Sequence, residues 1–166
     1  LAKQTKEDAY LVIQVGNKGL VIEKVDGPSH LKVVEEFGYE MYMHCGAIRK
    51  VLLAWQTPAF IDEYFKNIIL HDQAFPHVRP DDLREELKKI RQDGYAITHG
   101  EYVTDALGIG APVFNSDGEL AGSIGIIAPE IRVDTPEFLD TQKDLVQFYA
   151  SSLSADLGYE KHDVFQ

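Results

Sequence analysis

The sequence predicts an α+β fold in which helices pack on the faces of an antiparallel sheet. Strand-forming stretches gather in the first third of the chain and again between residues 94 and 129, and helical periodicity dominates between them and after them. Runs of strands separated by runs of helices are typical of α+β proteins, whereas a doubly wound α/β chain alternates the two. With 166 residues, of which 45% are hydrophobic, the chain is long enough for a single core, so one domain is expected.

The first third reads as strands. Tyr10–Val15 and Leu20–Val25 are rich in β-forming residues and flank a glycine-bounded turn at 16–19, which predicts a hairpin. A third strand is expected at Leu31–Glu35 and a fourth, short one at Tyr39–His44.

Helices are expected in the middle and at the end of the chain. Ile48, Val51, Leu52 and Trp55 follow the three-and-four spacing of an amphipathic helix that begins near Gly46. The other helices are predicted from capping signals. They are a helix opened by Thr57-Pro58, a helix over Leu83–Arg91 capped by Asp81 or Asp82 and ended by Gly94, and a long closing helix opened by Thr135-Pro136 and stopped at Gly158.

Between the last two helices lies a predicted β-ribbon. Leu107–Phe114 and Leu120–Ala128 are joined by a turn at 115–118, so the two strands should pair antiparallel. Both strands contain glycines, which weaken a strand and indicate that another group approaches the backbone closely. A packed helix is the favoured interpretation, and a bound ligand is the alternative.

Composition excludes several classes of protein. The net charge of −11 and the pI near 4.9 oppose binding of nucleic-acid phosphates by this segment. The sequence has no long apolar run for a membrane, and its one cysteine, Cys45, has no partner for an intrachain disulfide, so a cytoplasmic setting is expected. The chain begins with Leu1, which is expected of a fragment of a longer protein.

Catalytic and metal-binding signatures are absent from the sequence. No phosphate-binding loop, dinucleotide fingerprint, G-x-S-x-G or H-E-x-x-H motif occurs. His71 and His77 lack a partner at a ligand spacing, and Cys45 beside His44 is interpreted as a buried thiol because neighbours on a strand point in opposite directions. We therefore expect neither an enzyme, nor a cofactor, nor a metal site.

Four motifs, taken in order, resemble the effector-binding domain of IclR-type bacterial transcription regulators. They are Met41–Ala54 (MYMHCGAIRKVLLA), Arg91–Tyr102 (RQDGYAITHGEY), Ile109–Val133 (IGAPVFNSDGELAGSIGIIAPEIRV) and Asp156–Gly158 (DLG). The resemblance implies a GAF-like, profilin-like fold that senses a small-molecule effector. It implies that residues 7–160 are the effector-binding domain, that residues 1–6 end a connection from a winged helix-turn-helix domain, and that residues 161–166 are a tail.

The resemblance also implies partners. DNA would be bound only through the missing N-terminal domain, and the effector-binding domain would form a homodimer or homotetramer. Phe60, Tyr64 and Phe65 are candidates for a subunit interface, with internal packing as the equal alternative. A free-standing GAF-like module without DNA output is the alternative function.

Carried over residue by residue, the resemblance places the effector site at a helix start, after the Gly94-Tyr95 pair and on the ribbon. The implied effector-binding residues are Gly46, Ala47, Ile48, Thr98, Gly108, Gly125 and Ile127, with Arg49 as a further candidate. Free amides at a helix N-terminus favour a carboxylate, while Gly108, Gly125 and Ile127 favour a roomy apolar pocket. The expected effector is an organic acid with an apolar or aromatic body, and Gly125→Leu is expected to fill empty space. The equal alternative is that the glycines only admit bulky neighbours and the pocket is collapsed.

Overall fold

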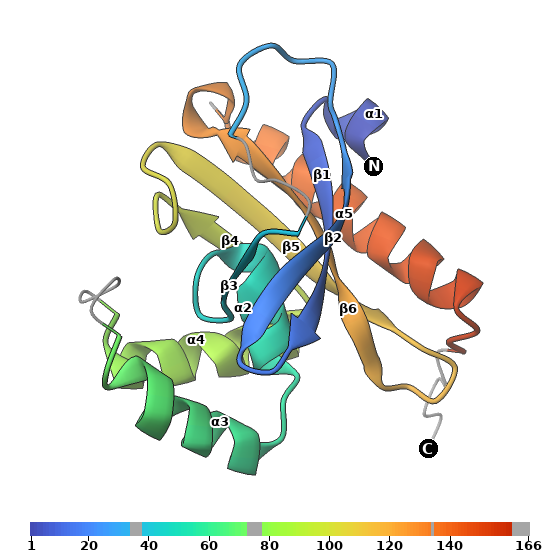
Figure 1. Cartoon of the computed structure of the whole chain (residues 1–166). Coiled ribbons are helices and arrows are strands. Elements are labelled where there is room, and N and C mark those ends of the chain that lie inside the picture. Colours follow the sequence, from blue (N-terminus) through green and yellow to red (C-terminus); the bar gives the residue numbers. More distant parts are fainter. Residues whose placement is uncertain (34–37, 73–77, 134, 161–166) are drawn as a thin grey trace.

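The structure is a computed structural model that describes residues 1–33, 38–72, 78–133 and 135–160. Within these residues the chain forms one six-stranded sheet in the order β3-β2-β1-β6-β5-β4, and every neighbouring pair is antiparallel (Figure 1). The strands are β1 (Asp8–Val15), β2 (Lys18–Val25), β3 (Glu40–Tyr42), β4 (Ala96–His99), β5 (Ala106–Phe114) and β6 (Leu120–Pro129). The predicted α+β class with an antiparallel sheet is confirmed.

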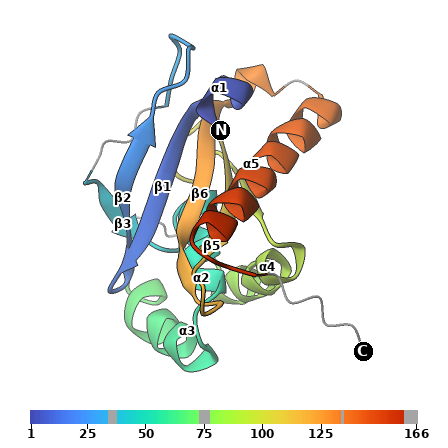
Figure 2. The ribbon, with the colours of Figure 1, turned by 90° about the vertical axis from the view of Figure 1, so that its right-hand side faces the viewer.

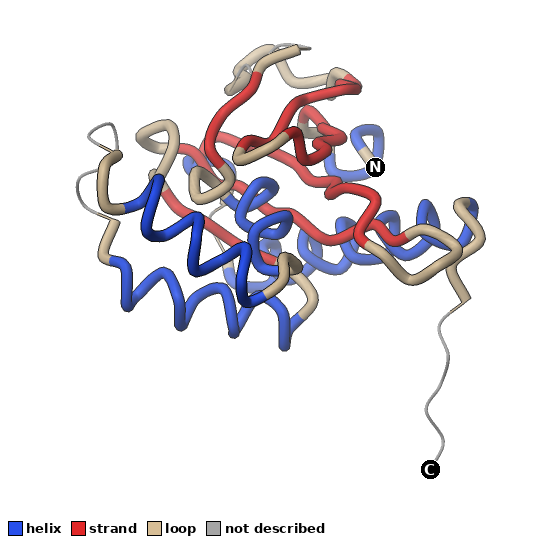
Figure 3. Tube along the Cα trace, turned by 60° about the horizontal axis from the view of Figure 1, so that its bottom comes forward, coloured by secondary structure: helices blue, strands red, loops and turns tan. Residues whose placement is uncertain are grey.

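Helices cover both faces of the sheet. On one face, α2 packs on β5 and β6, and α4 packs on α2. On the opposite face, α5 lies along β5 and β6, with the short α1 beside it (Figures 2 and 3). The helices are α1 (Ala2–Thr5), α2 (Ala47–Ala54), α3 (Pro58–Tyr64) continued by the π-helical turn η1 (Phe65–Ile69), α4 (Pro80–Asp93), the 3₁₀ turn η2 (Glu130–Arg132) and α5 (Pro136–Asp156).

The predicted capping residues of three helix ends are confirmed. Thr57 accepts a hydrogen bond from the Phe60 amide at 3.2 Å, and Thr135 accepts one from the Phe138 amide at 3.1 Å. Each cap is followed by a proline in the first turn, where the missing N–H costs nothing. Gly94 ends α4 with φ of 79°.

One predicted strand and one predicted helix cap are wrong. Leu31–Val33 form no strand, because the outer edge of β2 pairs instead with β3, Leu20 opposite Glu40; residues 34 and 35 of that predicted strand lie outside the described residues. The third helix begins at Pro80, after Arg79, and neither Asp81 nor Asp82 caps it. Both aspartates lie in the first turn, where their negative charges interact favourably with the positive end of the helix dipole.

The glycines of the ribbon formed by β5 and β6 allow a helix to pack against the strand backbones, as the favoured interpretation predicted. A Cβ on Gly110 would lie 2.7 Å from Cα of Ile48, and one on Gly125 would lie 2.6 Å from Cγ1 of Ile48. Cβ atoms do not pack that closely against carbon, so the N-terminal turn of α2 lies directly on the backbones of β5 and β6. The position of α2, and with it the position of its N-terminus, is fixed by these two glycines.

The aromatic residues considered for a subunit interface pack inside the chain. Tyr64 and Phe65 are 1% and 4% exposed, and Phe60 packs against the same core between α2, α3 and the sheet. The interface hypothesis is wrong for Tyr64 and Phe65, because these rings are buried within the chain, whereas Phe60 is only partly buried.

Candidate functional site

Three strands place a row of residues in register on the face of the sheet that α2 covers. Thr98 of β4 lies opposite Gly108 of β5, and Gly108 lies opposite Ile127 of β6. The next row contains Ala96, Gly110 and Gly125, and it lies under the first turn of α2. The row of Thr98, Gly108 and Ile127 therefore lines the space at the N-terminus of α2.

The N-terminus of α2 opens onto this row. Gly46 precedes the helix with φ of 77°, a left-handed conformation that a residue with a Cβ adopts only with strain. The Thr98 hydroxyl oxygen accepts a hydrogen bond from the Ala47 amide at 3.1 Å, which ties the helix start to β4. The first-turn amides of a helix cannot be satisfied within it, so this end of α2 favours a negatively charged group.

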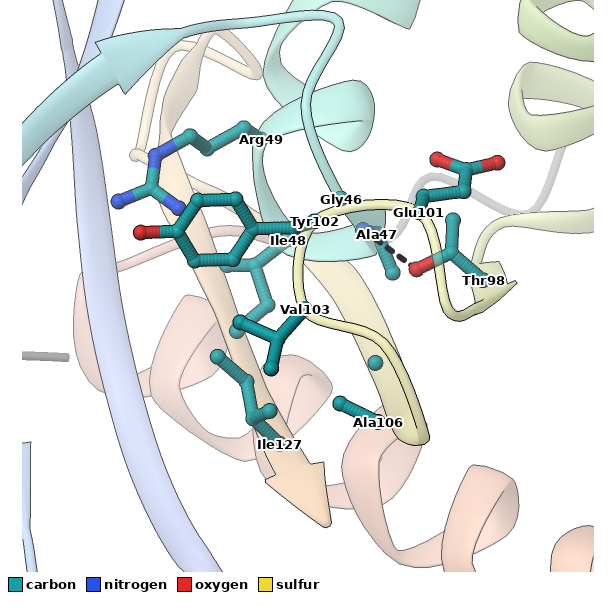
Figure 4. Close-up of a pocket in the computed structure, with 11 residues that line it drawn as sticks. Gly46, Ala47, Ile48, Arg49, Thr98, Glu101, Tyr102, Val103, Ala106 and Ile127 are labelled. Carbon is teal, nitrogen blue, oxygen red and sulfur yellow. Dashed lines mark hydrogen bonds between the residues drawn. The ribbon is translucent and has the colours of Figure 1, made fainter. Parts of the chain in front are cut away.

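Together these residues line a hollow that encloses about 360 Å³, including space open to solvent (Figure 4). The centre of a water molecule can occupy only about 30 Å³ of it, which is room for one or two waters. The lining residues are Gly46, Ala47, Ile48, Arg49, Thr98, Glu101, Tyr102, Val103, Ala106, Gly108 and Ile127. The hollow in this conformation is smaller than the roomy pocket that the sequence predicted.

Seven of the eight residues expected from the sequence line the hollow, and Gly125 does not. A Cβ on Gly125 would lie 2.1 Å from the carbonyl oxygen of Ile109, a backbone atom of the neighbouring strand. The expectation that a leucine at this position fills empty space is wrong, because Gly125 lies one row further along the sheet, beneath Ile48.

The sequence analysis missed four lining residues. Glu101, Tyr102 and Val103 belong to the connection between β4 and β5, and Ala106 begins β5. Figure 4 shows this connection passing across the hollow, with Tyr102 and Val103 over Ile48 and Ile127. Glu101 and Tyr102 end one of the family-like motifs, but no periodicity in this short segment indicates which way its side chains point.

Arg49 borders the hollow without pointing toward Thr98. Its guanidinium lies 5.8 Å from the ring centre of Tyr39 and 5.9 Å from that of Tyr102, and its Nε donates to the Gly19 carbonyl oxygen at 3.3 Å. The side chain runs along Tyr102 toward the edge of the sheet (Figure 4). Arg49 therefore supports the Tyr102 ring rather than the helix start.

A cluster of ion pairs lies next to the hollow and joins α2, α4 and the connection between β4 and β5. Nζ of Lys50, on α2, is 2.7 Å from a carboxylate oxygen of Glu101 and 2.7 Å from one of Glu86, on α4. The Lys50 side chain is 4% exposed, whereas both glutamates are 33% exposed. The charge of Glu101 in the hollow lining is thus compensated by a buried ammonium.

His44 and Cys45 do not form a nucleophile and base. The imidazole Nδ1 of His44 lies 2.9 Å from the Tyr64 hydroxyl, and Nε2 lies 2.9 Å from a carboxylate oxygen of Asp72. Burial lowers the pKa of His44 and raises the pKa of the Cys45 thiol to about 12, so the thiol stays protonated and unreactive. In the described part of the chain, no three His, Cys, Asp or Glu side chains are grouped to hold a metal ion, and no helix is long and apolar enough to cross a membrane.

A second, larger hollow lies between α5 and the end of β5. It offers about 560 Å³ to the centres of water molecules, and its lining includes Trp55, Phe114, Gln147, Ser151 and Tyr159. It contains none of the residues expected from the sequence, so it is a competing location for a ligand.

The fold defines the class of protein, an α+β domain with an antiparallel sheet covered by helices and a hollow at the start of α2. The chain belongs to the family described as bacterial transcriptional regulator IclR C-terminal, whose model matches residues 1–155. The family resemblance drawn from the sequence is confirmed; the match ends at residue 155, just before the motif at Asp156–Gly158.

Relatives in sequence and structure are transcription regulators. The chain is 26% identical over 160 residues to the HTH-type transcriptional regulator KipR of Bacillus subtilis, covering 96% of this chain and 64% of KipR. It is 30% identical over 141 residues to RhmR of Escherichia coli, an HTH-type regulator, covering 84% of this chain and 54% of RhmR. The crystal structure of Thermotoga maritima IclR superposes with a TM-score of 0.85 at 28% identity, covering 95% of this chain and 64% of that one. The chain thus spans between about half and two thirds of these proteins and belongs to a non-enzymatic family.

Proposed function

We propose that the hollow at the N-terminus of α2 is the effector site of an IclR-type regulator, with residues 7–160 as its effector-binding domain. The observation that supports this most strongly is the convergence of four elements on one point: the start of α2 at Gly46–Ile48, Thr98 of β4, and the facing positions of β5 and β6. Regulators of this family bind small-molecule effectors, which supports the role, and the convergence of these elements supports the location.

The chemistry of the lining favours an organic acid with an apolar or aromatic body. At one end the helix amides attract a carboxylate, and the Thr98 hydroxyl, already an acceptor from Ala47, keeps its proton to donate. The rest of the lining is largely apolar and includes Ile48, Val103, Ala106 and Ile127. The carboxylate head group thus binds at the N-terminus of α2, while the apolar body of the effector contacts β5, β6 and Val103.

A thermal-shift screen against small acids and aromatic compounds tests the site. A ligand at a hundred times its Kd stabilises the native state by about 2.7 kcal/mol, which raises the melting temperature of a domain of this size by roughly 5–11 °C. Thr98→Val keeps the shape of the side chain and removes the hydroxyl, so it should abolish most of that rise.

Ser123→Ala is the matched control. The Ser123 hydroxyl is fully buried and donates to the Ile48 carbonyl at 2.7 Å, so it also ties the sheet to α2, but it does not line the hollow. Ligand-induced shifts that survive in Thr98→Val, or that disappear equally in both variants, would count against the proposal.

For the whole protein, we propose that effector binding controls a winged helix-turn-helix domain that precedes residues 1–6, in a cytoplasmic regulator that is a homodimer or homotetramer. The curated relatives are HTH-type regulators, which favours this over a free-standing GAF-like module. Phe148 on α5 is 63% exposed and Leu157 is 46% exposed, so the outer side of α5 offers apolar surface for self-association. Sedimentation that shows only monomer at micromolar concentration would remove the oligomer from the proposal.

A further inference from the structure

Residues 100–105, which we call the strap, cover part of the hollow and leave the rest open to solvent. The strap connects β4 to β5 and carries Tyr102 and Val103 across the opening (Figure 4). Beneath it, water centres can occupy only about 30 Å³, whereas the smallest aromatic acid needs several times the volume of a water molecule. An effector of the proposed class therefore enters only if the strap moves.

The two ends of the strap are backbone bends closed by hydrogen bonds. Gly100 and Asp105, at its two ends, both have φ of 61°, so each end is a sharp left-handed bend. Three backbone hydrogen bonds hold it: the Ala106 amide donates to the Val103 carbonyl oxygen at 3.2 Å, the Gly100 amide to the Ala106 carbonyl oxygen at 2.8 Å, and the Glu130 amide to the Asp105 carbonyl oxygen at 2.8 Å. Val103, Thr104 and Asp105 are exposed, and segments with few buried contacts open at low free-energy cost.

One side chain of the strap is anchored in the interior. Glu101 reaches Lys50, and Lys50 also holds Glu86 of α4, each contact at 2.7 Å. Hydrogen bonds between charged groups are among the stronger ones, so this contact holds the strap against α2. When the Glu101 carboxylate moves away, the buried ammonium of Lys50 still pairs with Glu86. The ammonium is therefore never buried without a counter-charge, a state that would be strongly unfavourable.

We propose that Glu101 and Lys50 form a latch that keeps the strap closed over the hollow, and that Glu86 holds Lys50 in place while the latch opens. Lys50 is a positioning residue, since it acts on the hollow through Glu101 and Tyr102. The inference rests on the proposed function, because it assumes that the hollow is where the effector binds. Lys50 follows Arg49 on the helix whose first turn lines the hollow, so the latch and the site share α2.

Amide hydrogen exchange of the ligand-free protein, followed by NMR, tests the latch. Glu101→Gln removes the charge and keeps the shape, so we expect the amides of Gly100 and Ala106 to exchange about tenfold faster. Glu86→Gln is the matched control, because its nearest carboxylate oxygen lies at the same 2.7 Å from the same ammonium, with its second oxygen at 2.8 Å, and its side chain is equally exposed. In that variant Lys50 keeps Glu101, so exchange of the two amides should stay within about twofold of the unmodified protein.

A merely structural role would change both variants alike and would also accelerate exchange in the core of α2, at Leu52 and Leu53. Unchanged exchange of Gly100 and Ala106 in Glu101→Gln, or equal acceleration in the two variants, would overturn the latch. No ligand is used, so failure of this experiment leaves the effector site standing. Failure of aromatic acids such as benzoate to bind at the hollow would count against the proposed function and leave the exchange result intact.

Discussion

Gly125→Ala gives the sharpest test of how α2 is seated. A new Cβ would lie 2.1 Å from the Ile109 carbonyl oxygen, 2.6 Å from Cγ1 of Ile48 and 3.0 Å from Cα of Gly110, so two of its three nearest neighbours are backbone atoms that cannot rotate away. Replacing glycine by alanine within a strand ordinarily gains about 0.5–1 kcal/mol from backbone entropy. Overpacking a tight core costs about 1–3 kcal/mol, and the backbone clash places this variant at or above the upper end.

We therefore expect a net loss of about 2 kcal/mol or more in the free energy of unfolding. This corresponds to a fall of roughly 4–8 °C in the melting temperature. Urea denaturation, with the slope m checked for constancy, measures the change.

Gly108→Ala is the control on the same face of the ribbon. There the Cβ would meet the end of the Thr98 side chain at 3.0 Å and Cβ of Ala47 at 3.3 Å. The hydroxyl can give way, so the stability should change by less than about 1 kcal/mol. A Gly125→Ala protein as stable as the original would refute the close seating of α2 on the ribbon.

Three further predictions concern reactivity, pH and DNA. Burial raises the pKa of Cys45 to about 12, so at pH 8 only about one thiol in ten thousand is ionised and a disulfide reagent should label the chain only after unfolding; rapid labelling of the native protein would contradict this. Burial also lowers the pKa of His44 below its ordinary 6.5. The unfolded state then binds more protons just below pH 6.5, so stability should fall as the pH drops through that value, and an NMR titration that places the His44 pKa above 6.5 would exclude this contribution. With a net charge of −11, this chain alone should not shift duplex DNA in a gel at physiological salt, and binding that weakens steeply with added salt would reveal a basic patch.

The sequence predicted most elements of the fold because its signals are local. Periodicity located α2, threonine-proline pairs located the starts of α3 and α5, and glycine-rich β-forming runs located β5 and β6. The strand expected at Leu31 failed because strand propensity does not determine which segment occupies the edge of β2.

The site was only partly predictable, because its shape depends on where α2 packs on the sheet. Gly108 and Gly125 share the same face of the sheet, and no local pattern shows that one lines the hollow while the other lies beneath Ile48. The strap is a similar case, since Tyr102 closes the hollow through its contact with Arg49 and Tyr39, residues that are distant in the sequence.

The central claim is that an acidic effector binds at the start of α2, and NMR mapping tests it most directly. A hit from the thermal-shift screen, titrated into the isotopically labelled chain, should shift the amide signals of Ala47, Ile48, Thr98 and Tyr102, with smaller changes elsewhere. Shifts concentrated at Trp55, Gln147 and Ser151 would place the ligand in the hollow beside α5 and contradict the account.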